Sequence, residues 1–132
     1  MDSFIQSLVG KPYEVNSYSG HSFDCYSLIH YIYAHYGIII PKRITSHAIH
    51  NLQREIKHDI KAQLWREVSF KDKKFLDVLL FTTVGRLNTH VGMVVDSKFF
   101  IHAVENVSVC LGHLASDLNL ARLYKVYRWH TL

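Results

Sequence analysis

A cysteine and two histidines stand at positions suited to a nucleophile and its base. Cys25 follows Asp24 at the predicted start of an amphipathic helix, and His90 and His102 lie in two successive apolar segments. A thiol reacts as the thiolate, and a helix N-terminus or a nearby imidazolium lowers the pKa of a thiol. An imidazole can also protonate the amine that leaves an amide substrate. These residues therefore indicate a cysteine hydrolase with Cys25 as the nucleophile.

The two histidines are expected on one face of a β-hairpin. Segments 90–95 and 99–104 have the composition of strands, and the residues between them supply a turn. A turn centred on Ser97 makes the histidines diagonal neighbours, about 7–8 Å apart between backbones. A shift of register by one residue breaks this arrangement. His90 is accordingly predicted to act as the base, with His102 placed to orient its ring.

Three helical regions and about five strands are expected to position these residues. Apolar residues at spacings of three and four predict helices near 2–10 and 24–37 and a helical region over 45–64. Strands are predicted at 77–82, 90–95, 99–104, 107–111 and 122–129. Helices followed by antiparallel strands indicate an α+β fold with the helices on one face of the sheet.

Length and composition favour one globular domain spanning residues 1–132. The chain is 48% hydrophobic and 20% charged, which is enough to bury a core without metal or disulfide. No apolar run approaches the ~20 residues of a membrane span. The N-terminal segment lacks the basic start and apolar core of a secretory signal, so synthesis and retention in the cytoplasm are expected unless a dedicated machine exports the protein. The two cysteines, Cys25 and Cys110, argue against a disulfide framework, and Cys110 is interpreted as a buried strand residue.

The positive charge is spread rather than concentrated. Net charge is +4, and segment 54–74 holds seven basic and four acidic residues. This segment is interpreted as a solvated helix face, because a nucleic-acid site usually shows a denser basic stripe and a recognisable motif. No nucleic-acid partner is expected.

Five motifs occur in a characteristic order: Gly10-Lys11-Pro12-Tyr13, Phe23-Asp24-Cys25, Asp77–Phe81, His90–Val94 and Phe100–Ala103. With these motifs the chain resembles the NlpC family of cell-wall endopeptidases, which are small papain-like cysteine peptidases. The resemblance implies a papain-like fold, Cys25 as nucleophile, His90 as base and acid, and His102 as the orienting residue. It further implies that the Tyr13 hydroxyl and the Cys25 backbone amide bind the oxyanion, and that neither metal nor other cofactor is needed.

The same resemblance implies a substrate and a setting. Family members cut peptidoglycan stem peptides, commonly between D-glutamate and a diamino acid. An aromatic residue directly after the cysteine and the segments 77–81, 101–105 and 126–129 are similar to the branch found with phage tails and prophages. Phage-tail or secretion-machine proteins are therefore expected partners. The protein is expected to act on the cell wall after delivery by a virion or a secretion apparatus.

The chain departs from the family pattern at three places around the expected cleft. Glu14-Val15-Asn16 follows the tyrosine where the family has Trp-Gly-Gly, and Ser27 and Leu76 replace usual glycines. These changes bear on the choice of substrate more than on the catalytic trio.

Three alternatives stay open at this point. A thiolate and two imidazoles are also a zinc ligand set, although the close pairing of most zinc sites is missing here. A catalytically silent binding module could keep the fold, but the intact trio argues against it. An interbacterial amidase toxin or an acyltransferase could use the same Cys25, His90 and His102.

Overall fold

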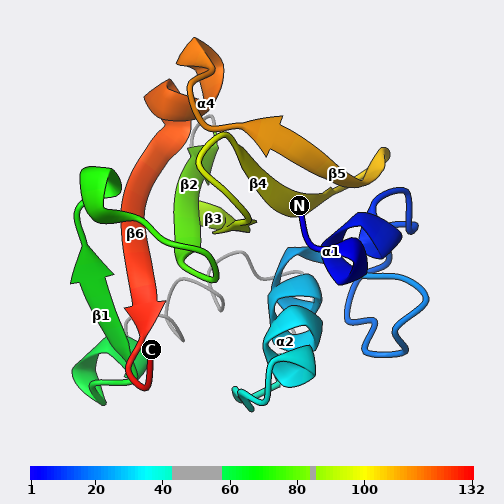
Figure 1. Ribbon diagram of the computed structural model, residues 1–132, viewed down its shortest axis with the longest axis horizontal. Coiled ribbons are helices and arrows are strands. Elements are labelled where there is room, and N and C mark those ends of the chain that lie inside the picture. The colour runs from blue at the N-terminus through cyan, green and yellow to red at the C-terminus, as the bar shows by residue number, and fades with distance from the viewer. Residues whose placement is uncertain (43–57, 84–85) are drawn as a thin grey trace.

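The structure, a computed structural model, describes residues 1–42, 58–83 and 86–132 (Figure 1). These residues form an antiparallel sheet of six strands in the order β1-β6-β2-β3-β4-β5. Helices α1 (Ser3–Leu8) and α2 (Cys25–His35) lie together at one side of the sheet, and α4 (Asp117–Arg122) precedes the last strand. The predicted α+β class is confirmed.

The final strand lies inside the sheet rather than at its edge. The strands are β1 (Trp65–Val68), β2 (Val78–Thr83), β3 (Arg86–Val94), β4 (Phe99–Val104), β5 (Ser108–His113) and β6 (Leu123–Trp129). Strands β2 to β5 form a meander. β6 then returns across the sheet and pairs with both β2 and β1 (Figure 1). Strand β6 thus lies between β1 and β2 and joins them into one sheet.

Strand β1 corrects the prediction for the charged segment 54–74. Its last part was interpreted as a helix face, but Trp65 pairs with Trp129 and Val68 with Val126. The two indole rings pack edge to face with centroids 5.0 Å apart. This pairing partner lies at the other end of the chain, so local periodicity carries no sign of it. The count of about five strands was therefore one short.

The helices seen within residues 1–42, 58–83 and 86–132 are short, and α2 has 11 residues. None of the helices in these ranges has the length and apolar character needed to cross a membrane. Residues 58–61 are helical, while the rest of the predicted helical region 45–64 falls mainly on residues outside the described ranges. Helix α4 and the 3-10 turn η1 (Phe70–Asp72) were not predicted.

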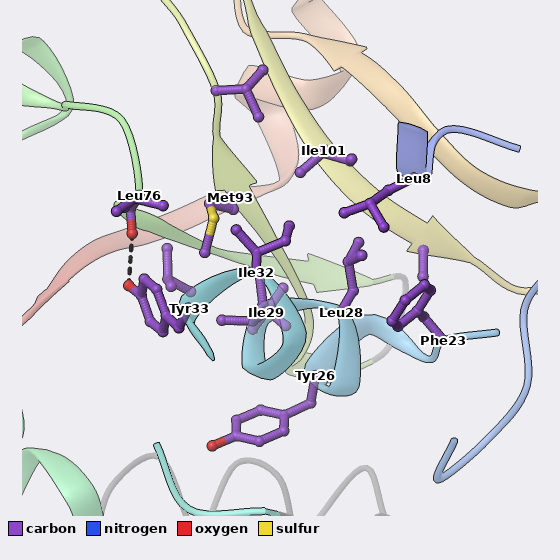
Figure 2. Packing of buried hydrophobic residues seen from close by; sticks show 14 of the residues in the cluster. Leu8, Phe23, Tyr26, Leu28, Ile29, Ile32, Tyr33, Leu76, Met93 and Ile101 are labelled. Carbon is purple, nitrogen blue, oxygen red and sulfur yellow. Dashed lines mark hydrogen bonds between the residues drawn. The ribbon is translucent and has the colours of Figure 1, made fainter. Parts of the chain in front are cut away.

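Helix α2 packs its apolar side on the sheet, where it contacts β3 and β4. The Tyr33 hydroxyl donates a hydrogen bond of 2.6 Å to the Leu76 carbonyl and ties the helix to the segment before β2 (Figure 2). Gly37, with φ of +82°, takes the left-handed conformation that ends the helix. The packed core between the helix and the sheet includes Leu28, Ile29, Ile32, Tyr33, Met93 and Ile101.

The sheet also buries residues on its other face, away from α2. This second cluster contains Leu79, Phe81, Val94, Phe100, Leu114 and Val126. Because side chains alternate along a strand, Ile101 and Ala103 face α2, whereas Phe100 and His102 face the second cluster. The predicted histidine pair is therefore set on the face that carries the smaller core.

A buried ion pair joins the beginning of β2 to β6. Asp77 is fully buried, and Arg128 donates to its two carboxylate oxygens from Nε and Nη2, each at 2.8 Å. Removal of one member of such a pair leaves a buried charge without compensation. The pair therefore holds β6 in its inserted position.

Candidate active site

Cys25 is the first residue of α2, and its position is set by a capping box. The Asp24 carboxylate accepts a hydrogen bond of 2.7 Å from the Ser27 amide, and the Ser27 hydroxyl accepts one of 2.9 Å from the Asp24 amide. Two backbone donors at the helix N-terminus are thereby satisfied. The second Asp24 oxygen accepts from the Asn16 amide at 2.7 Å. The predicted helix start is confirmed, and Asp24 links it to the loop after Tyr13.

The thiol lies beside the strand that carries His90, but its acidity differs from the expectation. Burial first, and the Asp24 carboxylate second, raise the pKa of Cys25 to about 12, although the backbone amide of Val91 acts in the opposite direction. The prediction that a helix N-terminus and an imidazolium would lower this pKa is therefore wrong for the substrate-free protein. Desolvation of the thiolate outweighs the helix terminus because the thiol sits at the helix–sheet contact.

The histidines meet as the hairpin register predicts. Asp96 Oδ1 accepts from the amides of Lys98 and Phe99, each at 2.8 Å, and closes the turn. Met93 pairs with Ile101 and Val94 with Phe100, which centres the hairpin on Ser97. His90 Nε2 then lies 2.8 Å from His102 Nδ1, a hydrogen-bond distance.

This contact fixes what each ring nitrogen can do. With Nε2 of His90 directed at His102, only Nδ1 of His90 is left to exchange a proton with a thiol or a substrate. If Nδ1 is to accept a proton, Nε2 must carry the hydrogen and donate it to Nδ1 of His102. The pair therefore has the form of a base and an orienting residue.

Aromatic rings and two glycines shape the surroundings of the histidine pair. Phe81 lies 5.8 Å from the His90 ring and Phe100 4.7 Å from the His102 ring, between centroids. A Cβ on Gly92 would approach Phe100 to 3.0 Å and the Cβ of His102 to 3.4 Å, and one on Gly112 would overlap the Phe100 ring. The glycines therefore make room for the rings that hold the pair.

Both histidines are neutral at physiological pH. Burial lowers the pKa of His90, and the neighbouring His102 lowers it further by a smaller amount. Burial also lowers the pKa of His102. An imidazolium in this apolar setting lacks the water that stabilises its charge. By the alternation of side chains along β3 and β4, His90 and His102 face the second cluster, whereas Cys25 packs with the core on the α2 side of the sheet. No hydrogen bond joins Cys25 to His90 among the described residues, so the structure brings the two histidines together but does not bring the thiol into contact with them. The resting site thus combines a neutral thiol with a neutral imidazole pair.

This resting state predicts the pH dependence of alkylation. The rate at which iodoacetamide modifies Cys25 is expected to rise continuously, about tenfold per pH unit, because the thiolate fraction grows that way below a raised pKa. The rate should be measured on Cys110→Ala protein from about pH 5 to pH 9, so that Cys25 is the one thiol that can be alkylated. A plateau from pH 5 to pH 8 would instead reveal a preformed thiolate–imidazolium pair and contradict the neutral resting state.

Tyr13 lies near the thiol, as the resemblance implies. It forms a parallel bridge with Phe23, and the Phe23 amide donates to the Pro12 carbonyl at 3.0 Å. Burial first, and then electrostatic repulsion from the ionisable side chains of Cys25, Asp24 and Glu105, raise the pKa of Tyr13 to about 12. Its hydroxyl consequently stays protonated and is available as a hydrogen-bond donor.

Two of the departures from the family pattern lie at positions with positive φ. Asn16 and Leu76 adopt φ of +58° and +78°, the left-handed region in which glycine is the ordinary choice. Asparagine tolerates this region well, and Leu76 is held there by burial and by its bond to Tyr33. Ser27 completes the capping box described above. Ser27 and Leu76 are thus buried parts of the scaffold, whereas Glu14 and Val15 line a surface pocket together with Pro12 and Tyr13.

The geometry also bears on the zinc alternative. A tetrahedral zinc ion bound about 2.1 Å from two imidazole nitrogens needs them about 3.4 Å apart. The facing nitrogens of His90 and His102 are 2.8 Å apart, so they bond to each other instead of flanking an ion. In the described parts of the chain, no group of three or more His, Cys, Asp or Glu side chains could hold a metal.

Five further residues near the histidine pair were not predicted as site residues. Together with His90 and His102 they line a pocket: Phe81, Thr82, Phe100, Asn119 and Arg122. Asn119 and Arg122 belong to α4, whose six residues were not recognised as a helix. The Ser116 cap, whose hydroxyl accepts from the Asn119 amide at 3.5 Å, was the available local signal for this helix.

Solved structures share this architecture. A protein similar to a lipoprotein of the NLP/P60 family from Staphylococcus aureus is 24% identical with a TM-score of 0.69, covering 96% of this chain and 39% of that one. NlpC1 from Trichomonas vaginalis is 20% identical with a TM-score of 0.71, and the match covers 96% of this chain and 42% of that one. The NlpC/p60 domain of the peptidoglycan hydrolase SagA is 19% identical with a TM-score of 0.66, and the match covers 96% of this chain and 93% of that one.

This chain spans about two fifths of the length of the first two of these proteins. At such identities the similarity establishes the fold, which is papain-like as predicted. No match was found among curated protein sequences. The model of the NlpC/P60 family matches residues 10–128, a stretch that includes Tyr13, Cys25, His90 and His102, and the chain therefore belongs to the NlpC/P60 family.

Proposed function

We propose that this protein is a cysteine endopeptidase that hydrolyses amide bonds in peptidoglycan stem peptides. The observation that carries the proposal is the 2.8 Å contact between His90 Nε2 and His102 Nδ1, which leaves Nδ1 of His90 available as a base next to Val91, whose backbone amide contacts Cys25. Membership of the NlpC/P60 family and the likeness to a domain of the peptidoglycan hydrolase SagA support the choice of substrate.

The first half of the reaction forms an acyl-enzyme. Nδ1 of His90 takes the proton from Cys25, and the sulfur attacks the carbonyl carbon of the substrate amide. The oxygen of the tetrahedral intermediate is bound by the Cys25 backbone amide and the Tyr13 hydroxyl. His90 then gives its proton to the departing nitrogen, the C–N bond breaks, and a thioester to Cys25 remains.

The second half releases the acid product. His90, neutral again, takes a proton from a water molecule, which attacks the thioester carbonyl. Collapse of the second tetrahedral intermediate breaks the C–S bond, and the proton returns from His90 to the Cys25 sulfur. His102 keeps the His90 ring in one tautomer and one orientation during both halves.

A more specific assignment concerns the bond and its setting. The bond is that between D-glutamate and the diamino acid of the stem peptide, and the setting is a phage tail or prophage, with delivery to the wall by a virion or a secretion apparatus. The motif similarities in segments 77–81, 101–105 and 126–129 support this setting. Tail-assembly genes beside the coding sequence support a virion enzyme, and an adjacent small immunity gene supports a toxin.

Digestion of purified peptidoglycan with mass analysis of the fragments tests the function. New fragments that begin with a free diamino acid amine and end with a free D-glutamate carboxylate are expected. Fragments joined to a new amine would show an acyltransferase, because the thioester then reacts with that amine instead of water. Intact peptides, with purified stem peptides also uncut, contradict the proposed function.

A further inference from the structure

A small pocket opens beside the histidine pair on the face of the sheet away from α2. Its volume is about 70 Å³, which is room for roughly two water-sized groups and hence for a carboxylate. The lining residues come from β2, β3, β4 and α4: Phe81, Thr82, His90, Phe100, His102, Asn119 and Arg122. The reaction as described uses only the two histidines.

Arg122 gives this pocket its charge. Both histidines are neutral because burial lowers the pKa of each, so Arg122 is the only lining residue with a full charge at neutral pH. No ion pair to Arg122 is found among the described residues. A guanidinium binds a carboxylate through two parallel hydrogen bonds, and the rings of Phe81 and Phe100 make another part of the pocket wall apolar.

The backbone holds Arg122 at this place. It is the last residue of α4, and its carbonyl accepts a hydrogen bond of 3.2 Å from the Thr82 hydroxyl. The next residue, Leu123, pairs with Phe81 across β6 and β2. Asn119 is fixed as well, because its side-chain amide donates to the His113 carbonyl at 2.9 Å. The pocket wall is therefore built before substrate arrives.

The chemistry of His90 assigns the pocket to one side of the substrate. A general acid must come within hydrogen-bond distance of the atom that it protonates, which here is the leaving amine. The amino acid that carries this amine thus contacts His90, and its substituents extend into the space beside that ring. We propose that Arg122 binds a carboxylate of the leaving diamino acid and makes the enzyme selective for substrates that carry it. This inference rests on the proposed peptidase function.

The test compares peptides that differ only in that carboxylate. γ-D-Glutamyl-diaminopimelate is assayed in three forms: with both carboxylates of the diaminopimelate free, with the α-carboxylate amidated, and with the side-chain carboxylate amidated. The lysine analogue, which lacks the side-chain carboxylate, is the fourth peptide. The wild type is expected to lose about 10- to 100-fold in kcat/KM when the recognised carboxylate is neutralised, and the pattern identifies which of the two it is.

Substitutions then assign the selectivity to Arg122. Arg122→Gln is expected to lose the same factor on the fully acidic peptide and nothing on the neutralised one, whereas Arg122→Lys recovers part of the loss. Arg66→Gln, at an exposed arginine on β1, is the matched control and should retain full selectivity. Equal losses of Arg122→Gln on acidic and neutralised peptides indicate a structural role and overturn the inference. So does a wild type that cleaves all four peptides equally. A wild type that cleaves none of them rejects the proposed function itself.

Discussion

Replacement of Cys25 by alanine is expected to abolish cleavage of stem peptides, with a fall in kcat of more than about 10⁴-fold. Loss of the nucleophile in other hydrolases has effects of this size. The fold should stay intact, because the helix N-terminus is capped by Asp24 and Ser27 rather than by the thiol. Peptide cleavage measured by mass spectrometry, with circular dichroism and thermal unfolding of the same sample, provides the check.

The second cysteine provides the control for this experiment. Cys110 lies on β5 opposite His102, as a strand residue, but it is partly rather than fully buried, which corrects the prediction; this partial burial raises the pKa of its free thiol. Cys110→Ala should cleave the peptides at close to the wild-type rate and should lose all activity on alkylation. Full activity in Cys25→Ala combined with loss in Cys110→Ala would transfer the nucleophile to β5 and refute the assignment.

Position 102 should follow the order His, then Asn, then Gln, then Ala in activity. The atom of His102 that bonds His90 is Nδ1, one bond beyond Cγ, and Oδ1 of asparagine occupies nearly the same place. The side-chain oxygen of glutamine is one bond farther from the backbone, so it does not coincide with the position of His102 Nδ1. Alanine offers no acceptor, so the His90 ring can rotate and its tautomer is unset. A loss of about 10²- to 10⁴-fold is expected for His102→Ala, by analogy with the tautomer effect in a serine protease, and at least tenfold less for His102→Asn.

The same series separates the peptidase from the zinc alternative. Asparagine is a poor zinc ligand, so a metal site should lose as much activity with His102→Asn as with His102→Ala. A chelator should then inactivate the wild type, and added zinc should restore it. Resistance of wild-type kcat/KM to chelator, with Asn clearly above Ala, is the expected result. Equal losses with chelator-sensitive activity contradict the mechanism.

Local sequence patterns determined much of the site. The capping residues placed Cys25 at the start of α2, and period-2 alternation with a short turn centred on Ser97 placed His90 and His102 on one face. These features depend on neighbours only a few residues apart, where side-chain periodicity and turn chemistry decide the conformation. The short motifs and their order along the chain could also be seen in the sequence, and they predicted the family and the papain-like fold that the comparisons establish.

Other features required the tertiary structure. Trp65 meets Trp129 in a strand pair that joins distant parts of the chain, and β6 inserts beside β2, where the hydrogen bond of Thr82 and the pairing of Leu123 fix Arg122 near the histidines. The sequence also did not predict that the pKa of Cys25 is raised. Desolvation depends on how much protein surrounds a group and not on which residues adjoin it in sequence. Sequence specified which groups can react. Long-range packing decided their protonation states and the charge beside them, since burial and strand pairing are properties of the whole chain.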